Sequence, residues 1–477
     1  GRHLGLPLYA FSPNTTKEIS LSSCFYSYVC FNGRSLFIFK ESTLTVRLVS
    51  SLFALFFSVA LLVVGNGFLM TLLGIRLSLD EVDPRLIGGV MVSYSIGFVL
   101  GSLYSSVVIQ RVGHIRAFAV FCAVLAIASL VYPMTDNFPL WLGLRIVGGF
   151  AMAGLLIISE SWFSAIATND NRSTIFSLYQ VCFYLATSIG QLLVTLGHPS
   201  NYFLFSLVAA ILIAAIVPLS LTRMQAPHLE KKIERLSLSK VFAVSPLGLV
   251  STLVSGIIVS SFYGVGPLFA NLIGFSVDQI AWFMSASVFS AMLFAWPVGW
   301  LCDRIDRVKM LLYLAGLSAL CSLILSSNLE SFWLVIIANG AFMAFVAAIY
   351  PVGVALMNDR ISHDQMISAS ATLLLSFGIG SCIGPVVSSA LIEWVGAGGM
   401  YIGNTVLLLT LCVYVQYRLG KGLTVDVDHQ EPYVALMPEV SPVINELNPL
   451  NDQFEEVPLE EIQPLEDIHP KEEPEAK

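Results

Sequence analysis

Twelve long apolar stretches dominate the chain between about residue 50 and residue 417. A helix needs roughly 20 apolar residues to cross a bilayer, and each stretch approaches or exceeds that length. Soluble helices of this length carry a polar face, which these stretches lack. The pattern therefore predicts an all-α integral membrane protein with twelve transmembrane helices. The predicted spans are 50–75, 87–109, 117–134, 138–165, 174–196, 201–222, 247–272, 279–301, 309–327, 332–356, 368–391 and 397–417.

Basic residues alternate from loop to loop between these spans. Every loop that follows an even-numbered span carries Lys or Arg, with the largest group after the sixth span. Among the loops that follow odd-numbered spans, only the first carries any, namely Arg76 and Arg85. Because cytoplasmic loops carry the excess of Lys and Arg, the even-numbered loops are predicted to be cytoplasmic. Both termini would then lie in the cytoplasm.

The spans divide into two groups of six, separated by a charged linker. The predicted organisation is an N-terminal extension over 1–46, a six-helix bundle over 47–222, a cytoplasmic linker over 223–246, a second six-helix bundle over 247–420 and a tail over 421–477. The extension lacks the features of a signal peptide. The tail is acidic and Pro-rich, and its low apolar content predicts disorder.

The two groups of spans also resemble each other in sequence. Gly149–Ala153 in the fourth span resembles Gly340–Ala344 in the tenth, at an offset of 191 residues. Ser188–Gly190 in the fifth span resembles Cys382–Gly384 in the eleventh, at an offset of 194. A duplication of this kind predicts two parallel six-helix halves, with a substrate bound near the membrane midplane between them.

Composition narrows the classes of function. The mean hydropathy is +0.79, and only 12% of residues are charged. The net charge of -8 arises largely in the tail, so no basic surface indicates a nucleic-acid partner. The eight Cys residues show no metal-binding spacing. The spans contain no His pair, Cys cluster or paired carboxylates, so we expect no enzyme activity, no metal and no cofactor.

The loop after the eighth span carries the most specific motif, Gly299-Trp-Leu-Cys-Asp-Arg-Ile-Asp-Arg-Val-Lys309. It resembles the signature loop of the major facilitator superfamily, Gly-x-x-x-Asp-Arg-x-Gly-Arg-Arg/Lys. Asp306 replaces the second Gly of that pattern, and the final Lys309 is displaced. The loop after the second span resembles a degraded copy in which Gln110 replaces the Asp. The resemblance covers roughly residues 50–418 and implies a transporter with a small-molecule substrate.

Charged residues in these loops are candidates for a latch, meaning charged hydrogen bonds between helix ends that form in only one conformation. The alternative interpretation is that the basic residues only set the membrane topology. The candidate latch residues are Arg111, Gly113, Arg116, Glu160, Arg172, Gly299, Asp303, Arg304 and Arg307. Glu160 lies within the fourth span, so it is a candidate either for a permanent ion-pair partner or for a proton carrier.

Polar residues within the spans are candidates for substrate binding. Arg145 in the fourth span is the clearest, because an intramembrane Arg is costly and usually functional. It would bind an anionic group or modulate a proton site; the alternatives are a structural role and snorkelling to the interface. The candidate substrate-binding residues are Arg145, Asn66, Tyr94, Gln191, Tyr263 and Asn339. For each of the uncharged residues, a hydrogen bond between helices is the alternative.

Shorter segments resemble the YcaD-type permeases of Gram-negative bacteria. They are His114–Phe118, Glu160–Trp162 and Gly190-Gln191. This resemblance implies a monomeric permease of the inner membrane, coupled to an ion such as the proton, but it implies no particular substrate. A transporter-like sensor or scaffold that acts through the acidic tail is the alternative function.

The charge pattern makes a direct prediction about orientation. A reporter that is active only in the cytoplasm should be active when fused after Lys240 or Lys421, and silent when fused near Asn137 or Ser200. Reporter activity in intact cells measures this. Silence after Lys240 would contradict the predicted orientation.

Overall fold

The computed structural model describes residues 35–167, 171–221, 236–327, 329, 331–362 and 365–421, and further along the chain residues 430, 433, 434 and 437. The chain divides into two units, Gly1–Val49 and Ser50–Lys477. Except for residues 47–49, both predicted six-helix bundles therefore belong to one unit. The first helix, α1, already begins at Ser35, within the segment that the sequence assigned to the extension. The predicted linker is described only from residue 236 onward.

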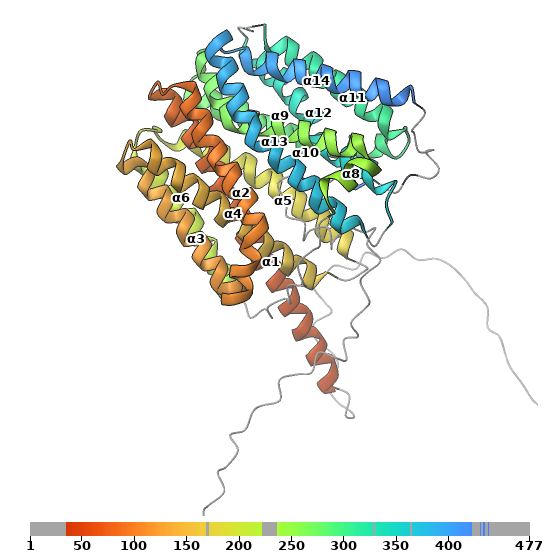
Figure 1. Ribbon diagram of the computed structural model, residues 1–477. Coiled ribbons are helices and arrows are strands. Elements are labelled where there is room, and N and C mark those ends of the chain that lie inside the picture. Colours follow the sequence, from red (N-terminus) through yellow and green to blue (C-terminus); the bar gives the residue numbers. More distant parts are fainter. Residues whose placement is uncertain are drawn as a thin grey trace, which may run out of the picture. The chain divides into compact units, whose positions relative to one another are not determined.

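The described part of the chain is helical, and the predicted fold class is confirmed. It contains twelve helical stretches that are long and apolar enough to cross a membrane. The elements in chain order are α1 (Ser35–Leu79), α2 (Pro84–Val112), α3 (His114–Val131), α4 (Phe138–Ile166), α5 (Arg172–Leu192), α6 (Tyr202–Ala214), α7 (Ile216–Leu221), α8 (Leu238–Val244), α9 (Pro246–Leu272), α10 (Val277–Cys302), α11 (Arg307–Leu325), α12 (Phe332–Asn358), α13 (Met366–Val395) and α14 (Gly399–Leu419) (Figure 1). Together α6 and α7 form the sixth span, and α8 is a short helix that the sequence did not predict.

Glycines bring helix backbones into direct contact inside each half. A Cβ atom on Gly190 of α5 would lie 2.3 Å from the carbonyl oxygen of Val64 in α1. In the second half, a Cβ atom on Gly384 of α13 would lie 2.1 Å from the carbonyl oxygen of Ile257 in α9. The two contacts are related by offsets of 194 residues (384 − 190) and 193 residues (257 − 64). The predicted sequence repeat is therefore also a repeat of helix contacts.

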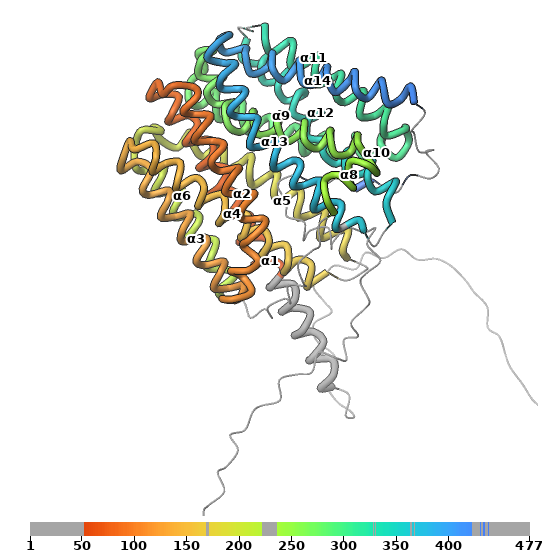
Figure 2. The backbone as a smooth tube through the Cα atoms, viewed as in Figure 1, coloured from red at the N-terminus to blue at the C-terminus, as the bar shows by residue number. Residues whose placement is uncertain are grey.

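Among the described helices, the two halves meet most extensively between α2 and α13 and between α5 and α10, and α2 also contacts α9. In Figure 2 the chain colours separate the halves, with α2, α3, α4 and α6 on one side and α9 to α14 on the other. Because successive spans run in opposite directions, the described ends of α2, α4, α10, α12 and α14 lie on one side of the bundle, which we call the basic face. The loops after odd-numbered spans form the opposite face.

The two repeat-related loops of the basic face turn in different ways. Gly113 ends α2 and precedes α3 with a φ of 86°, a left-handed conformation that favours glycine. In the loop after α10, Asp306 stands where the superfamily pattern has its second Gly. Asp306 has a φ of -50°, and its carboxylate accepts hydrogen bonds from the backbone amides of Val308 and Lys309 at 2.8 and 3.2 Å. It is thus the N-cap of α11, which accounts for the replacement.

Candidate functional site

A cavity of about 130 Å³ lies between the two halves. Helices α1, α2, α4 and α5 line it from the first half, and α9 and α13 from the second. Its wall combines aromatic rings and thioethers with hydroxyl and amide groups. None of the described residues that line the cavity carries a charge. The wall therefore suits a ligand that has apolar surface and uncharged hydrogen-bonding groups.

Four of the six predicted substrate-binding residues line this cavity: Asn66, Tyr94, Gln191 and Tyr263. The hydroxyl of Tyr94 donates to Oδ1 of Asn66 at 3.3 Å, which connects α2 to α1. Gln191 is only 1% exposed, and its Oε1 has no hydrogen-bond partner among the described residues. A buried acceptor without a partner is costly. It is therefore a natural contact for a donor on a bound ligand.

Arg145 lies behind the cavity wall rather than in it. It is 2% exposed, and its guanidinium lies over the Tyr94 ring, 4.6 Å from the centroid. Its Nη2 approaches Sδ of Met70 at 2.8 Å and Sδ of Met91 at 3.6 Å. Its Nε has no hydrogen-bond partner in the described part of the chain. Tyr94, Met70 and Met91 all line the cavity, so Arg145 supports three side chains of the wall.

Asn339 is not among the residues that line the cavity. Its Nδ2 donates to Oγ of Ser287 at 2.6 Å, and its Oδ1 accepts from the hydroxyl of Tyr401 at 2.7 Å. These bonds connect α12 to α10 and α14. The structure thus places Asn339 in contacts between helices, the alternative that the sequence left open.

Polar contacts join the two halves toward the opposite face. Nδ2 of Asn271 at the end of α9 donates to Oγ of Ser78 at the end of α1, at 2.8 Å. Arg85 at the start of α2 forms an ion pair with Glu393 near the end of α13. These two contacts close the gap between the halves beyond the cavity.

The same interface continues between α5 and α10. The hydroxyls of Ser188 and Ser285 lie 2.6 Å apart, and Oγ of Ser188 also donates to the Ser285 carbonyl oxygen at 3.0 Å. Ser188 is only three residues from Gln191, which lines the cavity. The halves are therefore joined beside the cavity as well as beyond it.

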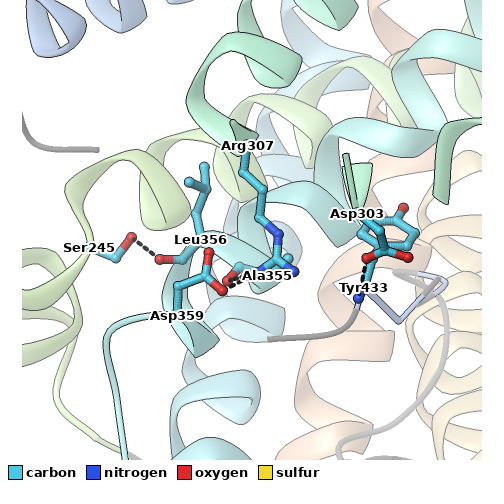
Figure 3. Close-up of polar contacts among 7 residues, drawn as sticks. All are labelled: Ser245, Asp303, Arg307, Ala355, Leu356, Asp359 and Tyr433. Carbon is cyan, nitrogen blue, oxygen red and sulfur yellow. Dashed lines mark hydrogen bonds and ion pairs between the residues drawn. The ribbon is translucent and has the colours of Figure 1, made fainter. Parts of the chain in front are cut away.

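On the basic face, the signature loop after α10 contains a buried ion pair. Arg307 pairs with Asp359, and each side chain is 1% exposed. Nη1 of Arg307 also donates to the carbonyl oxygen of Ala355 at 3.2 Å (Figure 3). The pair connects the start of α11 to the end of α12, so it lies within the second half and does not cross to the first.

The other predicted latch residues of this loop make different contacts. Nη1 of Arg304 donates to the carbonyl oxygen of Trp300 at 2.9 Å, and its guanidinium stacks on the indole at 4.0 Å. The exposed Asp303 accepts a hydrogen bond at 2.9 Å from the backbone amide of Tyr433, which lies in the tail (Figure 3). Gly299, one turn earlier in α10, lies against the Tyr433 ring.

The predicted latch residues of the first half are divided between surface and interior. Arg111 at the end of α2, Gly113 between the helices and Arg116 at the start of α3 are exposed. Arg172 is buried at the start of α5. Glu160 is 0% exposed in α4, and its Oε1 accepts a hydrogen bond from the hydroxyl of Tyr179 in α5 at 2.9 Å. Glu160 therefore lies in a polar contact between α4 and α5, apart from the residues that line the cavity.

Several important residues were not predicted from the sequence. Asp359 lies in a loop where the charge pattern drew attention only to basic residues, although an acid at the end of the tenth span was a usable signal. Tyr433 lies in the tail that was expected to be disordered, and the apolar run that begins there was the available signal. Ser78, Asn271 and Glu393 have no local signal, because their contacts depend on how the halves meet.

Among the described residues there is no group of three or more His, Cys, Asp and Glu side chains suited to a metal ion. The six described Cys residues, Cys122, Cys182, Cys302, Cys321, Cys382 and Cys412, are free thiols. The chemistry available at the cavity is therefore reversible binding by hydrogen bonds and apolar contact.

Comparison with known proteins agrees with this architecture. The sequence profile described as Major Facilitator Superfamily matches residues 48–277 and 248–430. The chain therefore belongs to the Major Facilitator Superfamily. The family and its fold are those of transporters rather than enzymes.

Curated relatives are similar over most of the chain. An uncharacterized MFS-type transporter YcaD of Escherichia fergusonii is 28% identical over 337 residues, covering 70% of this chain and 86% of the relative. An uncharacterized MFS-type transporter of Yersinia pestis is 28% identical over 376 residues, covering 77% of this chain and 94% of the relative. The predicted resemblance to YcaD-type permeases is thus confirmed.

Solved structures share the fold at low sequence identity. The nucleoside transporter NupG has a TM-score of 0.65 at 14% identity, covering 78% of this chain and 99% of NupG. A bacterial homologue of the human lysosomal transporter Spinster, in an inward-facing and occupied conformation, has a TM-score of 0.61 at 15% identity. That comparison covers 80% of this chain and 97% of the homologue.

The buried ion pair gives a stability prediction. The substitution Arg307→Ala leaves the Asp359 carboxylate buried without its partner. It should lower the free energy of unfolding by about 3–5 kcal/mol. The thermal unfolding midpoint of the purified protein in detergent should fall accordingly. Lys309→Ala is the matched control, because Lys309 is exposed on the same helix, and it should change stability by at most about 0.5 kcal/mol. Equal midpoints for both variants would contradict a structural role for the pair.

Proposed function

We propose that this chain is a secondary transporter that moves a small solute across the membrane by alternating access. The observation that carries the proposal is an uncharged, partly polar cavity between two repeat-related halves. In transporters with repeated halves, the substrate binds at the interface of the repeats, and the halves rock around it. Glycine contacts make each half internally close-packed, which suits movement as a rigid body.

The contacts between the halves support an inward-facing state. The Ser78–Asn271 and Arg85–Glu393 contacts join the halves at the opposite face. The Arg307–Asp359 pair of the basic face holds only the second half together. With the basic face in the cytoplasm, the protein is closed to the outside. We further propose that it is a monomer in the inner membrane, with both termini cytoplasmic and lipid as its surroundings.

Alternating access can be tested without knowing the substrate. Ser381 lines the cavity, and its hydroxyl donates to a carbonyl of its own helix, so Ser381→Cys should preserve the contacts between helices. In a background without the other cysteines, a membrane-impermeant thiol reagent should label this residue from either side of the membrane. Adding Ser78→Cys and Asn271→Cys and oxidising that pair should abolish labelling from outside but leave labelling from the cytoplasm.

The control is the same triple variant under reducing conditions, which should be labelled from both sides. Undiminished outside labelling after the Ser78–Asn271 pair has been cross-linked would overturn alternating access through this cavity.

We also propose that the substrate is uncharged and carries hydrogen-bond donors beside apolar or aromatic surface. Gln191 presents an acceptor oxygen without a partner among the described residues. Tyr94 and Tyr263 add hydroxyl groups, and Phe98, Phe183 and Phe377 add rings. Arg145 lies against Tyr94 and two sulfur atoms, so its role becomes that of a support for the wall. An anionic substrate would need a cation that the described lining does not supply.

The proposed substrate class predicts how strongly three matched probes, which share a 4-hydroxyphenyl ring, stabilise the protein. Uncharged tyrosol should raise the unfolding temperature of the purified protein more than tyramine, a cation, or 4-hydroxyphenylacetate, an anion, because a ligand of the native state stabilises it by mass action. Gln191→Leu should remove the tyrosol effect, whereas Gln416→Leu on exposed α14 surface should not. Greater stabilisation by 4-hydroxyphenylacetate would contradict the uncharged class and return Arg145 to the binding site.

We further propose that transport is coupled to protons, and Glu160 is the candidate residue for this coupling. It is a fully buried carboxylate in a membrane-spanning helix, and Tyr179 donates a hydrogen bond to it. A proton taken up there would alter the contact between α4 and α5, both of which line the cavity. If Glu160→Gln leaves the pH dependence of probe binding unchanged, coupling through this residue is excluded.

A further inference from the structure

Part of the C-terminal tail contacts the signature loop. The backbone amide of Tyr433 donates to Oδ1 of Asp303 at 2.9 Å. A Cβ atom on Gly299 would lie 3.1 and 3.2 Å from two carbons of the Tyr433 ring, so the ring lies against the glycine surface. Gly299 and Asp303 are one helical turn apart at the end of α10. Together they form a small docking surface. Gly299 contacts the ring of Tyr433, and the carboxylate of Asp303 accepts a hydrogen bond from its backbone amide.

Neighbouring tail residues are also packed. Met437 is 2% exposed and belongs to the hydrophobic core, and Tyr433 and Val434 pack against that core. In sequence, Tyr433–Met437 reads Tyr-Val-Ala-Leu-Met, an apolar run between Pro432 and Pro438 in an otherwise acidic tail. The superfamily profile ends at residue 430, before this run begins. The run is therefore an addition to the part of the chain that the family defines.

The position of Tyr433 relates it to both halves. Burial raises the pKa of Tyr433 well above its usual range, and nearby Cys302, Tyr184 and Asp303 act in the same direction. Cys302 and Asp303 belong to the second half, whereas Tyr184 lies on α5 of the first half. Tyr433 and Tyr184 both pack against the hydrophobic core of the helix bundle. An outward-facing state requires the helix ends of the basic face to approach each other, and a peptide held there opposes that movement.

We propose that the part of the tail that includes Tyr433, Val434 and Met437 is a built-in docking segment that binds the Gly299–Asp303 surface and holds the transporter inward-facing. The backbone amide of Tyr433 donates a hydrogen bond to the carboxylate of Asp303. The sequence predicted that this carboxylate forms part of a latch between helix ends. The docked segment occupies Oδ1 of Asp303 and lies over the surface of Gly299, so another helix end that is to use the same oxygen must displace the segment. Release of the segment is therefore part of the change to the outward-facing state.

The effect of the docking segment on the inward–outward equilibrium is measured in the Ser381→Cys variant. The rate at which the impermeant reagent labels this cysteine from outside the membrane reports the population of the outward-facing state. Truncation after Lys421 removes the segment, and Tyr433→Ala removes its ring. Each should raise the outside labelling rate, by about tenfold for the truncation, because a lost hydrogen bond to a charged group shifts a two-state equilibrium by roughly that factor. Tyr433→Phe is the matched control, since it keeps the ring and the backbone amide, and it should label at the parental rate.

A second measurement tests docking itself. In the cysteine-free background, Gly299→Cys with Tyr433→Cys should be joined by a short thiol-reactive cross-linker, and the joined protein should label more slowly from outside than the unjoined protein. An unchanged or lower outside labelling rate in the truncated protein would overturn the proposed restraint. Failure to form the cross-link in the folded, full-length double variant would overturn the docking. Neither result depends on the identity of the substrate.

Discussion

Direct contact between helix backbones is the constraint on which this structure depends. Lipid tails are as apolar as leucine, so burial of apolar surface gives little drive for one membrane helix to bind another. Close packing must supply the attraction, and it requires residues without side-chain bulk at the crossings. Gly190 against Val64 and Gly384 against Ile257 meet this requirement at repeat-related positions. Helices α1, α5, α9 and α13, which these crossings join, all line the cavity, so its shape follows from them.

The spans and the duplication were predictable because each depends on composition along a single helix. Asn66, Tyr94, Gln191 and Tyr263 were candidates because they are polar residues within the spans, and they line the cavity. Hydropathy says nothing about the rotation of a helix around its own axis, which packing determines. A one-dimensional pattern therefore could not show that Arg145 faces two sulfur atoms and a ring.

The same limit applies to contacts between distant segments. Asn339 bonds to residues on two other helices, and nothing in the sequence near it indicates either partner. Asp359 lies 52 positions from Arg307, and Tyr433 lies 130 positions from Asp303. Such pairs depend on tertiary geometry. The replacement of the second glycine of the signature motif by Asp306, by contrast, was visible in the sequence, but its cause, the capping of α11, required the backbone conformation.

The composition of the cavity wall also determines which chemical damage would affect it. Met70, Met91 and Met152 all line the cavity, and the sulfur atoms of the first two lie within 3.6 Å of the Arg145 guanidinium. Oxidation of a methionine to its sulfoxide replaces a flexible apolar group by a polar one with a strong acceptor oxygen. At Met70 or Met91 that oxygen would face a buried cation and draw it away from the Tyr94 ring. Oxidative stress would thus remodel the wall chemically, and reductive repair of the sulfoxide would restore it.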